Sequence, residues 1–433
     1  MRISVAVVAL LALSGCALYT DVSVAPLHLN PADIERGSDM QSMQRKADYL
    51  RAMAMSPTVD ARQKKTAPEL HALGSVYLAA GRFDDARTRL RAALDLQPFR
   101  TTYGQIAWDL AQVEYMANNY ESSLEWAKLA REHDLSIRQW HIDFMEALQG
   151  TRVYQFSGDK SARLPFRFGR PDVPRVTAAV NGQNIEAIID SGAVLSIVSQ
   201  RLAASANVRS LGAFEGTFYG LLGEPIQVRF GIIEKLDLGT LTVANVPVAI
   251  MPDEKMRFLI SKREGREFHM DFLLGTNLLK EFRLELNFDH HRVTFKPLTA
   301  ADRRPDAEQN LFFEGFRPYV RGTINRKGWY LFVLDTGSEI TFLNETRLRA
   351  LPVMSMLGAH SAMLQGLGGT MKRGSKIEDV EVGMDKWAGK FRMLPMYSSS
   401  EKEMAVGIIG QNFLRHFNVV IDFGRMRMDL ERR

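Results

Sequence analysis

Two segments of the chain share one form. Residues 187–196 read Ala-Ile-Ile-Asp-Ser-Gly-Ala-Val-Leu-Ser, and residues 332–341 read Phe-Val-Leu-Asp-Thr-Gly-Ser-Glu-Ile-Thr. In each segment an aliphatic run of the kind found in β-strands leads into an aspartate, a hydroxyl residue and a glycine. The segments therefore predict two similar strand-to-turn units, one ending at Asp190 and the other at Asp335.

Landmarks of the same kind follow both segments in the same order and at nearly constant separation. They pair as Gly220 with Gly366, Gly223 with Gly369, Gly275 with Gly410, Phe282 with Phe417, and Phe288 with Phe423. So many ordered correspondences indicate an internal duplication. We expect one β-rich lobe over residues 163–298, a linker over 299–310, and a second lobe over 311–433.

The duplicated triplets, each followed later by two aliphatic residues and a glycine, resemble the motifs of aspartic proteases. The likeness is greatest to bacterial retropepsin-like enzymes, with two lobes fused in one chain as in pepsins, and it covers residues 163–432. A single Asp-Thr-Gly would be weak evidence, because acidic turn tripeptides are common. The resemblance implies a bilobal acid-protease fold and an endopeptidase that acts on polypeptides without a cofactor or metal.

By position, the resemblance assigns the catalytic pair to Asp190 and Asp335. Two carboxyl groups that face each other cannot both ionise easily, so they share one proton. The resemblance implies that the ionised member takes a proton from the attacking water and the protonated member donates toward the substrate carbonyl. Since both aspartates lie in one chain, a complete site does not require a dimer.

The residues around each aspartate have expected supporting roles. Ser191 and Thr336 are expected to hydrogen-bond to the opposite loop, and Gly192 and Gly337 to let the two backbones approach closely. Ser338 follows the second triplet and is expected to donate to the adjacent carboxylate.

The first triplet has Ala193 at that position and lacks such a donor. An extra donor favours the ionised form of a carboxyl group. We therefore expect Asp335 to ionise more readily and Asp190 to carry the proton more often.

The later glycines, Gly275 and Gly410, are expected to pack behind the two loops.

Two glycine-rich segments resemble the flap of retropepsins, a hairpin that closes over a bound peptide. The first, residues 218–223, includes Tyr219 and Gly220, and the second, residues 364–369, includes Gly366, Gly368 and Gly369. Tyr219 either offers its hydroxyl to substrate, as a flap tyrosine does in pepsins, or is a surface loop tyrosine. The sequence leaves both alternatives open.

The amino-terminal residues resemble a bacterial lipoprotein signal. Arg2, a short apolar run and Leu-Ser-Gly precede Cys16, the only cysteine in the chain. The run is shorter than the roughly 20 residues that span a bilayer. We expect residues 1–15 to be a signal peptide and Cys16 to carry lipid in the periplasm. Ala17 favours the outer membrane over the inner. The alternative is an ordinary secretory signal with an incidental cysteine.

Residues 67–150 show helical spacing that resembles tetratricopeptide repeats. Leu70, Gly74, Tyr77, Ala86 and Pro98 fit one repeat, and a weaker copy begins near Gly104. Residues 16–66 would supply the anchor, a linker and a capping helix at 33–55, and residues 137–148 another helix. Such arrays usually bind a protein partner, but a helical spacer packed on the neighbouring lobe is an equal alternative.

Composition limits the other classes of function. The 433 residues carry a net charge of only +5, with 46% hydrophobic and 24% charged residues, which gives no case for nucleic-acid binding. One cysteine excludes internal disulfides and cysteine-based zinc sites. The expected architecture is a multidomain α + β chain, with helical hairpins followed by the mostly β bilobal unit. A non-catalytic lipoprotein that binds peptides or scaffolds an envelope complex is the rival interpretation.

Overall fold

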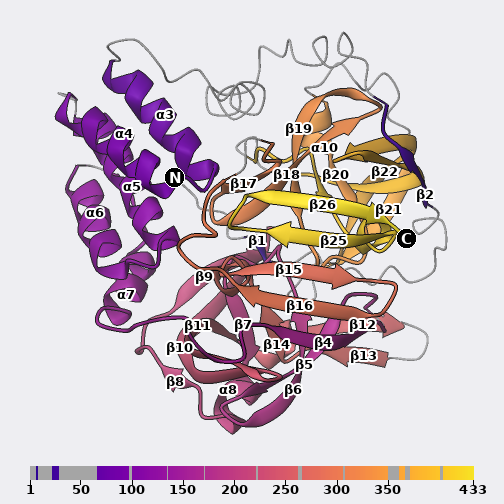
Figure 1. The fold of residues 1–433 in the computed structure, drawn as a ribbon, viewed down its shortest axis with the longest axis horizontal. Helices are drawn as coiled ribbons and strands as arrows, with labels where there is room; N and C mark the ends of the chain where they lie inside the picture. The colour runs from indigo at the N-terminus through magenta and orange to yellow at the C-terminus, as the bar shows by residue number, and fades with distance from the viewer. Residues whose placement is uncertain are drawn as a thin grey trace.

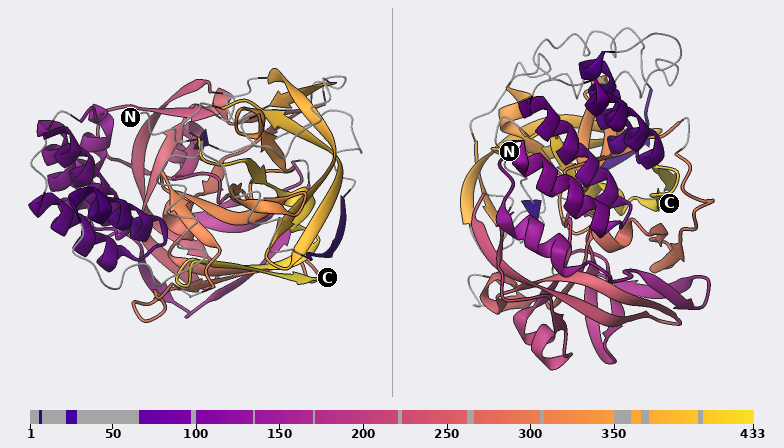
Figure 2. Two further views of the ribbon diagram at one scale, coloured as in Figure 1. Left: turned by 90° about the horizontal axis from the view of Figure 1, so that it is seen from above. Right: turned by 90° about the vertical axis from the view of Figure 1, so that its left-hand side faces the viewer.

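The structure is a computed structural model of residues 1–433. It describes residues 6–7, 22–28, 66–96, 100–133, 135–169, 171–220, 223–261, 266–305, 308–349, 360–365, 371–399 and 403–433. Most of the predicted signal peptide, Cys16, the predicted helix at 33–55 and the flap glycines Gly366, Gly368 and Gly369 lie outside these residues. A helical region lies at one side of two β-rich lobes (Figures 1 and 2).

The helical region consists of two hairpins and a further helix. Its helices are α3 (Ala67–Ala79), α4 (Phe83–Asp95), α5 (Arg100–Met116), α6 (Tyr120–Glu132) and α7 (Gln139–Ala147). The α3–α4 crossing is close because Gly74 has no side chain: a β-carbon there would lie 2.5 Å from Leu90 Cγ. At the second hairpin a β-carbon on Gly104 would lie 2.6 Å from the His133 carbonyl oxygen. The predicted small residues therefore stand where helices meet.

The first lobe is mostly β-sheet, with two long strands, β10 and β11, among shorter ones. Its strands are β3 (Gln155–Gly158), β4 (Ala162–Arg167), β5 (Arg175–Val180), β6 (Gln183–Ile189), β7 (Ser196–Ser199), β8 (Arg209–Ser210), β9 (Gly216–Gly220), β10 (Pro225–Leu238), β11 (Leu241–Met251), β12 (Arg257–Ser261), β13 (Arg266–His269) and β14 (Phe272–Leu274), with helices α8 (Gln200–Ser205) and α9 (Thr276–Leu279). A two-residue turn joins β5 to β6. Asn181 and Gly182 have φ of 47° and 88° there, as the Asn-Gly pair predicts.

The second lobe repeats the main elements of the first in the same order, with fewer strands among the described residues. It contains β17 (Leu311–Glu314), β18 (Arg317–Ile324), β19 (Lys327–Leu334), β20 (Phe342–Asn344), β21 (His360–Gln365), β22 (Met371–Met384), β23 (Trp387–Tyr397) and β24 (Gly407–Ile409), with α10 (Glu345–Leu348) and α11 (Gln411–Leu414). The long strands β10 and β22 each have 14 residues, and their partners β11 and β23 each have 11.

The strand pairing is duplicated as well as the order. In the first lobe β14 runs parallel to β6, with Leu274 opposite Ile189. In the second lobe β24 runs parallel to β19, with Ile409 opposite Leu334. The strand before each aspartate therefore lies beside the strand before each later glycine.

A sheet shared by the two lobes joins them. It contains β15 (Phe282–Asn287), β16 (Arg292–Pro297), β25 (Phe417–Asp422) and β26 (Arg427–Arg432). Strands β15 and β25 pair antiparallel, with Leu284 opposite Ile421, and both residues are buried. This pairing makes one continuous sheet from the first lobe into the second, as the ribbon shows (Figure 1).

Two short strands near the amino terminus add to the lobes. Strand β2 (Val22–Pro26) pairs with β23 of the second lobe, with Val24 opposite Gly389. Strand β1 (Ala6–Val7) runs parallel to β9, with Ala6 opposite Tyr219. Residues 22–26, expected only as part of an anchor and linker, therefore belong to the sheet of the second lobe.

The helical region packs on both lobes. Asn118, in the turn between α5 and α6, donates to Glu281 of the first lobe (2.9 Å) and accepts from Lys280 (2.7 Å). The Tyr115 ring lies 4.7 Å, between centroids, from the ring of Phe316 in the second lobe. The helices are thus held against the lobes by these contacts.

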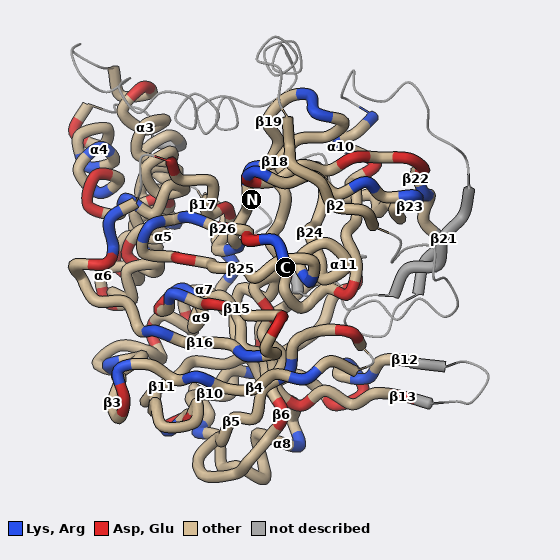
Figure 3. Tube along the Cα trace, turned by 45° about the vertical axis from the view of Figure 1, so that its right-hand side comes forward, with Lys and Arg blue, Asp and Glu red and all other residues tan. Residues whose placement is uncertain are grey.

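Basic and acidic residues are interspersed over the two lobes in the part of the chain that the structure describes (Figure 3). None of the helices in the part of the chain that the structure describes is both long and apolar enough to span a membrane.

Candidate active site

The two aspartates occupy equivalent positions at the junction of the lobes. Asp190 directly follows β6, and its backbone N–H donates to the Leu274 carbonyl at 3.0 Å. Asp335 directly follows β19, and its N–H donates to the Ile409 carbonyl at 3.1 Å. Both side chains are almost fully buried, with 0% and 2% exposure. Each aspartate thus lies at the end of a buried pair of parallel strands, β6 with β14 or β19 with β24.

Four hydrogen bonds between Ser191 and Thr336 and their surroundings connect the two loops. Ser191 Oγ donates to the Leu334 carbonyl (2.7 Å) and accepts from the Thr336 N–H (3.0 Å). Thr336 Oγ1 donates to the Ile189 carbonyl (2.8 Å) and accepts from the Ser191 N–H (3.0 Å). Each hydroxyl therefore satisfies one donor and one acceptor of the other lobe, in a dry environment where an unpaired backbone group is costly.

The glycines of the triplets bring the carboxyl groups to the opposite loop. A β-carbon on Gly192 would lie 2.5 Å from Asp335 Oδ2, and one on Gly337 would lie 2.5 Å from Asp190 Cγ. Each carboxyl group thus occupies the space that a side chain on the opposite glycine would fill. Any larger residue at either position would displace a carboxyl group.

Burial and charge raise the pKa of Asp190. Burial contributes most, followed by the negative charge of Asp335, and a hydrogen bond with the Asp335 side chain acts in the same direction. The Gly192 and Ala193 N–H groups, both 3.0 Å from Asp190 Oδ1, oppose these effects. The net result is a pKa well above the usual range, so Asp190 holds a proton where an ordinary aspartate is ionised.

The expected role of Ser338 is wrong. Its hydroxyl donates to the Ile340 carbonyl at 2.9 Å, and not to Asp335 as expected. The extra backbone donor is found in the first lobe, where Ala193 contributes its N–H to Asp190. Side-chain donors can be read from the sequence, whereas the turn geometry decides which backbone N–H groups face the carboxylate. Asp190 has the raised pKa because of burial and its charged neighbour.

The later glycines lie directly behind the loops. A β-carbon on Gly275 would lie 2.5 Å from the Leu195 carbonyl carbon, and one on Gly410 would lie 2.6 Å from that of Ile340. At Gly275 and at Gly410 the backbone therefore lies too close to the active loop for a residue that has a side chain.

Two residues that the sequence analysis missed follow these glycines. Thr276 Oγ1 donates to the Ser191 carbonyl, and Gln411 Nε2 donates to the Thr336 carbonyl, both at 2.7 Å. They hold the two triplets from behind in equivalent positions. Their place immediately after the repeated Gly275 and Gly410 was the available signal, although the side chains differ.

The described flap residues contact the helical region. Arg138, just before α7, donates to the Tyr219 hydroxyl (3.0 Å), and its guanidinium lies 5.1 Å from the centre of the Tyr219 ring. Gly220 lies against Glu224 at the turn that follows β9. No pattern around Arg138 indicated this contact, because it joins residues 81 positions apart.

Among the described residues, no group of three or more His, Cys, Asp or Glu side chains is arranged to hold a metal ion.

Comparisons with known proteins agree with the duplicated architecture. One family model, described as aspartyl protease, matches residues 176–278, and another, described as retroviral aspartyl protease, matches residues 315–422. A solved structure, a retropepsin-like aspartic protease from Rickettsia conorii, aligns over 33% of this chain and 96% of its own, with 14% identity and a TM-score of 0.21. No curated protein matches the chain.

The family matches fall on the two lobes, and each match contains one of the aspartates. The two matches, one to an aspartyl protease model and one to a retroviral aspartyl protease model, support an aspartic-type endopeptidase.

Proposed function

We propose that this protein is an endopeptidase of the bacterial cell envelope, anchored to the membrane, in which Asp190 and Asp335 form one intramolecular catalytic pair. The observation that carries the proposal is the mutual placement of the two loops. Each buried carboxyl group lies against the glycine of the opposite lobe, and the Ser191–Thr336 hydrogen bonds fix both loops.

The pair shares one proton, and the raised pKa of Asp190 supports placing that proton on Asp190. Asp190, whose pKa is raised, holds the proton and donates it to the carbonyl oxygen of the scissile peptide. Asp335 is the ionised member and accepts a proton from the attacking water. The tetrahedral intermediate then loses its carbon–nitrogen bond. The leaving amine takes up the proton that the pair received from water, and one hydroxyl of the intermediate returns its proton to the pair as the new carboxyl group forms. The products are a new carboxyl terminus and a new amine, and both aspartates return to their starting states.

The anchor belongs to the same proposal. Only five residues separate Cys16 from β2, which pairs with β23 of the second lobe. An extended residue spans at most about 3.6 Å, so lipid on Cys16 would keep the second lobe within roughly 20 Å of the bilayer. The enzyme would then act on polypeptides close to the outer membrane. The tetratricopeptide-like helices would offer a surface to a protein partner.

The decisive experiment uses the full chain in detergent beside its Asp190→Asn and Asp335→Asn variants. A diverse peptide mixture is incubated with each protein from acid to neutral pH, and the products are identified by mass spectrometry. We expect the wild type to cleave and either variant to lose at least about 100-fold of the rate, because proton transfer is worth that much or more. Equal cleavage by all three would refute the catalytic pair. Peptide binding with no cleavage by the wild type would support the non-catalytic alternative.

The anchor is tested separately. Expression of the wild type and Cys16→Ser, followed by membrane fractionation and intact-mass analysis, should show a lipid mass and membrane association only for the wild type. An unmodified Cys16 in the mature protein would contradict this part of the proposal and leave the protease activity unaffected.

A further inference from the structure

A buried group of charges joins the helical region to α9, the short helix that supports the first active loop. Lys280 and Glu281 follow α9 directly and form an ion pair, and their side chains are only 4% and 6% exposed. Asn118, in the turn between α5 and α6, accepts from Lys280 Nζ at 2.7 Å and donates to Glu281 Oε1 at 2.9 Å. Arg303, from the linker between the lobes, donates to Glu281 Oε2 and to the Lys280 carbonyl. Three separate parts of the chain thus meet at the end of α9.

The ion pair depends on its hydrogen-bond partners because it is buried. Burial acts to raise the pKa of Glu281, but the charges of Lys280 and Arg303 and the hydrogen bond from Asn118 outweigh it and leave the pKa below its usual range. A buried ion pair is tolerated only when hydrogen bonds satisfy its remaining groups. The Asn118 amide bonds both members at once, so its removal leaves each of them short of a partner.

Helix α9 reaches from this pair to the first active loop. It has only four residues, too few for a stable helix by itself, so the contacts at its two ends set its position. At its amino end, Thr276 Oγ1 donates to the Ser191 carbonyl and the Thr276 N–H donates to the Ala193 carbonyl, both at 2.7 Å. Asn277 Oδ1 accepts from the Ser196 N–H at 2.6 Å. A displacement at the carboxyl end of α9 therefore reaches the active loop within about one helical turn.

The second lobe has a different arrangement at the equivalent place. Arg415 follows Gly410 by five residues, as Lys280 follows Gly275. The Arg415 guanidinium donates to Asp172 of the first lobe at 2.6 Å, and these two side chains are 32% and 40% exposed. The helical region therefore covers the end of the supporting helix in the first lobe, whereas the end of α11 in the second lobe stays partly open to solvent.

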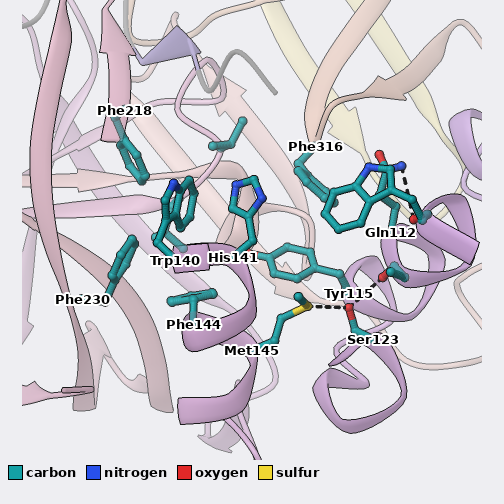
Figure 4. Close-up of a pocket in the computed structure, with 14 residues that line it drawn as sticks. Gln112, Tyr115, Ser123, Trp140, His141, Phe144, Met145, Phe218, Phe230 and Phe316 are labelled. Atoms are coloured by element: carbon teal, nitrogen blue, oxygen red, sulfur yellow. Dashed lines mark hydrogen bonds between the residues drawn. The ribbon is translucent and has the colours of Figure 1, made fainter. Parts of the chain in front are cut away.

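Aromatic contacts hold the turn that carries Asn118 against both lobes. Tyr115, three residues earlier, lies 4.7 Å from Phe316 of the second lobe, and Trp140 of α7 lies 5.5 Å from Phe230 of the first lobe, between ring centroids (Figure 4). These contacts do not involve the Asn118 amide. Its removal therefore tests the polar connection to α9 and leaves the apolar packing of the helices in place.

We propose that Asn118 is a positioning residue of the protease, which acts through Lys280, Glu281 and α9 to keep the first active loop aligned with the second. The proposal rests on the proposed function, and it makes the helical region a part of the active-site support. The residue lies outside the segments matched by the protease family models. Loss of this support misplaces the Asp190 carboxyl group relative to the scissile bond, so it slows the chemical step more than it weakens substrate binding.

The first test is Asn118→Gly in the full chain in detergent. Asn118 has φ of 62°, so glycine removes the amide and keeps the backbone conformation. We expect kcat on one peptide to fall about tenfold, with KM changed by less than about twofold. Asn207→Gly, at an exposed turn of the first lobe with φ of 51°, is the matched control and should keep the wild-type kinetics. An unchanged kcat in Asn118→Gly, or an equal fall in both variants, would overturn the proposal.

The second test does not depend on cleavage. Hydrogen exchange is followed by mass spectrometry for the wild type and both glycine variants, at a temperature where circular dichroism shows each to be folded. We expect the backbone amides of residues 191–196 to exchange about tenfold faster in Asn118→Gly, and those of β10 in the same lobe to keep the wild-type rate.

The exchange pattern also separates this proposal from the proposed function. Faster exchange spread over the whole chain would indicate general destabilisation, and this outcome, like an unchanged rate at residues 191–196, would contradict the positioning role. Faster exchange confined to the loop, with a wild type that cleaves no peptide, would retain the connection between Asn118 and the loop and reject the protease.

Discussion

The two lobes have nearly the same active loop but different surroundings. Both triplets are held by the same set of bonds: to the opposite strand, to the opposite hydroxyl, and to the residue after the later glycine. Around them the lobes differ. The first lobe has its flap strand fixed to Arg138 of the helical region, whereas the second has β2 added beside β23. The duplication therefore preserved the contacts between the loops, and each lobe acquired its own outer contacts.

The hydrogen bonds between the two active loops are common to both lobes. The strongest test of them removes the hydroxyl groups of Ser191 and Thr336. Ser191→Ala and Thr336→Ala each leave a buried N–H and a buried carbonyl without their partner, so we expect each to lower the free energy of unfolding by about 2–3 kcal/mol. Denaturant unfolding measures the loss. Thr336→Ser keeps the hydroxyl and should cost less than about 1 kcal/mol. A loss in only one of the two alanine variants would show that the lobes do not depend on each other equally.

The pH dependence of stability probes the carboxyl of the first lobe. Because the pKa of Asp190 is raised by folding, the folded state keeps a proton that the unfolded state releases. The stability associated with this group is therefore complete below about pH 4 and falls as the pH rises through the folded-state pKa. Asp190→Asn removes this loss of stability at higher pH, because the amide does not ionise.

Thermal unfolding at pH 4 and pH 7 measures the effect. The variant should be stabilised relative to the wild type at pH 7, and less so at pH 4. Asp159→Asn, at an exposed turn, is the control. A relative stability of Asp190→Asn that does not change with pH would contradict the assignment.

Only the first lobe has a flap strand, β9, that is held by Arg138 of the helical region. Arg138→Ala removes both the hydrogen bond to Tyr219 and the cation above its ring, so we expect kcat/KM to fall by about tenfold. Tyr219→Phe keeps the ring interaction, and its expected loss is about threefold. Steady-state kinetics on one peptide compares them. A wild-type rate in Tyr219→Phe would exclude a role of the hydroxyl with substrate.

The smallest expected effect concerns Ser338, which follows the second triplet where Ala193 follows the first. Ser338 donates to the Ile340 carbonyl, so Ser338→Ala should cost about 1 kcal/mol of stability. The acidic limb of the pH–rate profile should not move, because the hydroxyl does not bond Asp335. A shift of the acidic limb would instead support the donation from Ser338 to Asp335 that the sequence predicts.

The sequence by itself determined the duplication, the two loops and the glycines behind them. These features depend on short-range requirements: an aliphatic strand before Asp190 and Asp335, and no side chain at Gly192, Gly337, Gly275 or Gly410. A close approach leaves a clear trace in sequence, because only glycine fits.

Only the tertiary structure decided which groups face the carboxyls and what surrounds the site. The donation of Ser338 to Ile340, the pairing of β15 with β25, the β2 strand on the second lobe, and the contact of Arg138 with Tyr219 all join groups whose identity leaves many partners open. Serine, arginine and apolar strand residues satisfy their bonds in many arrangements. The packing of the lobes and helices selects one of them.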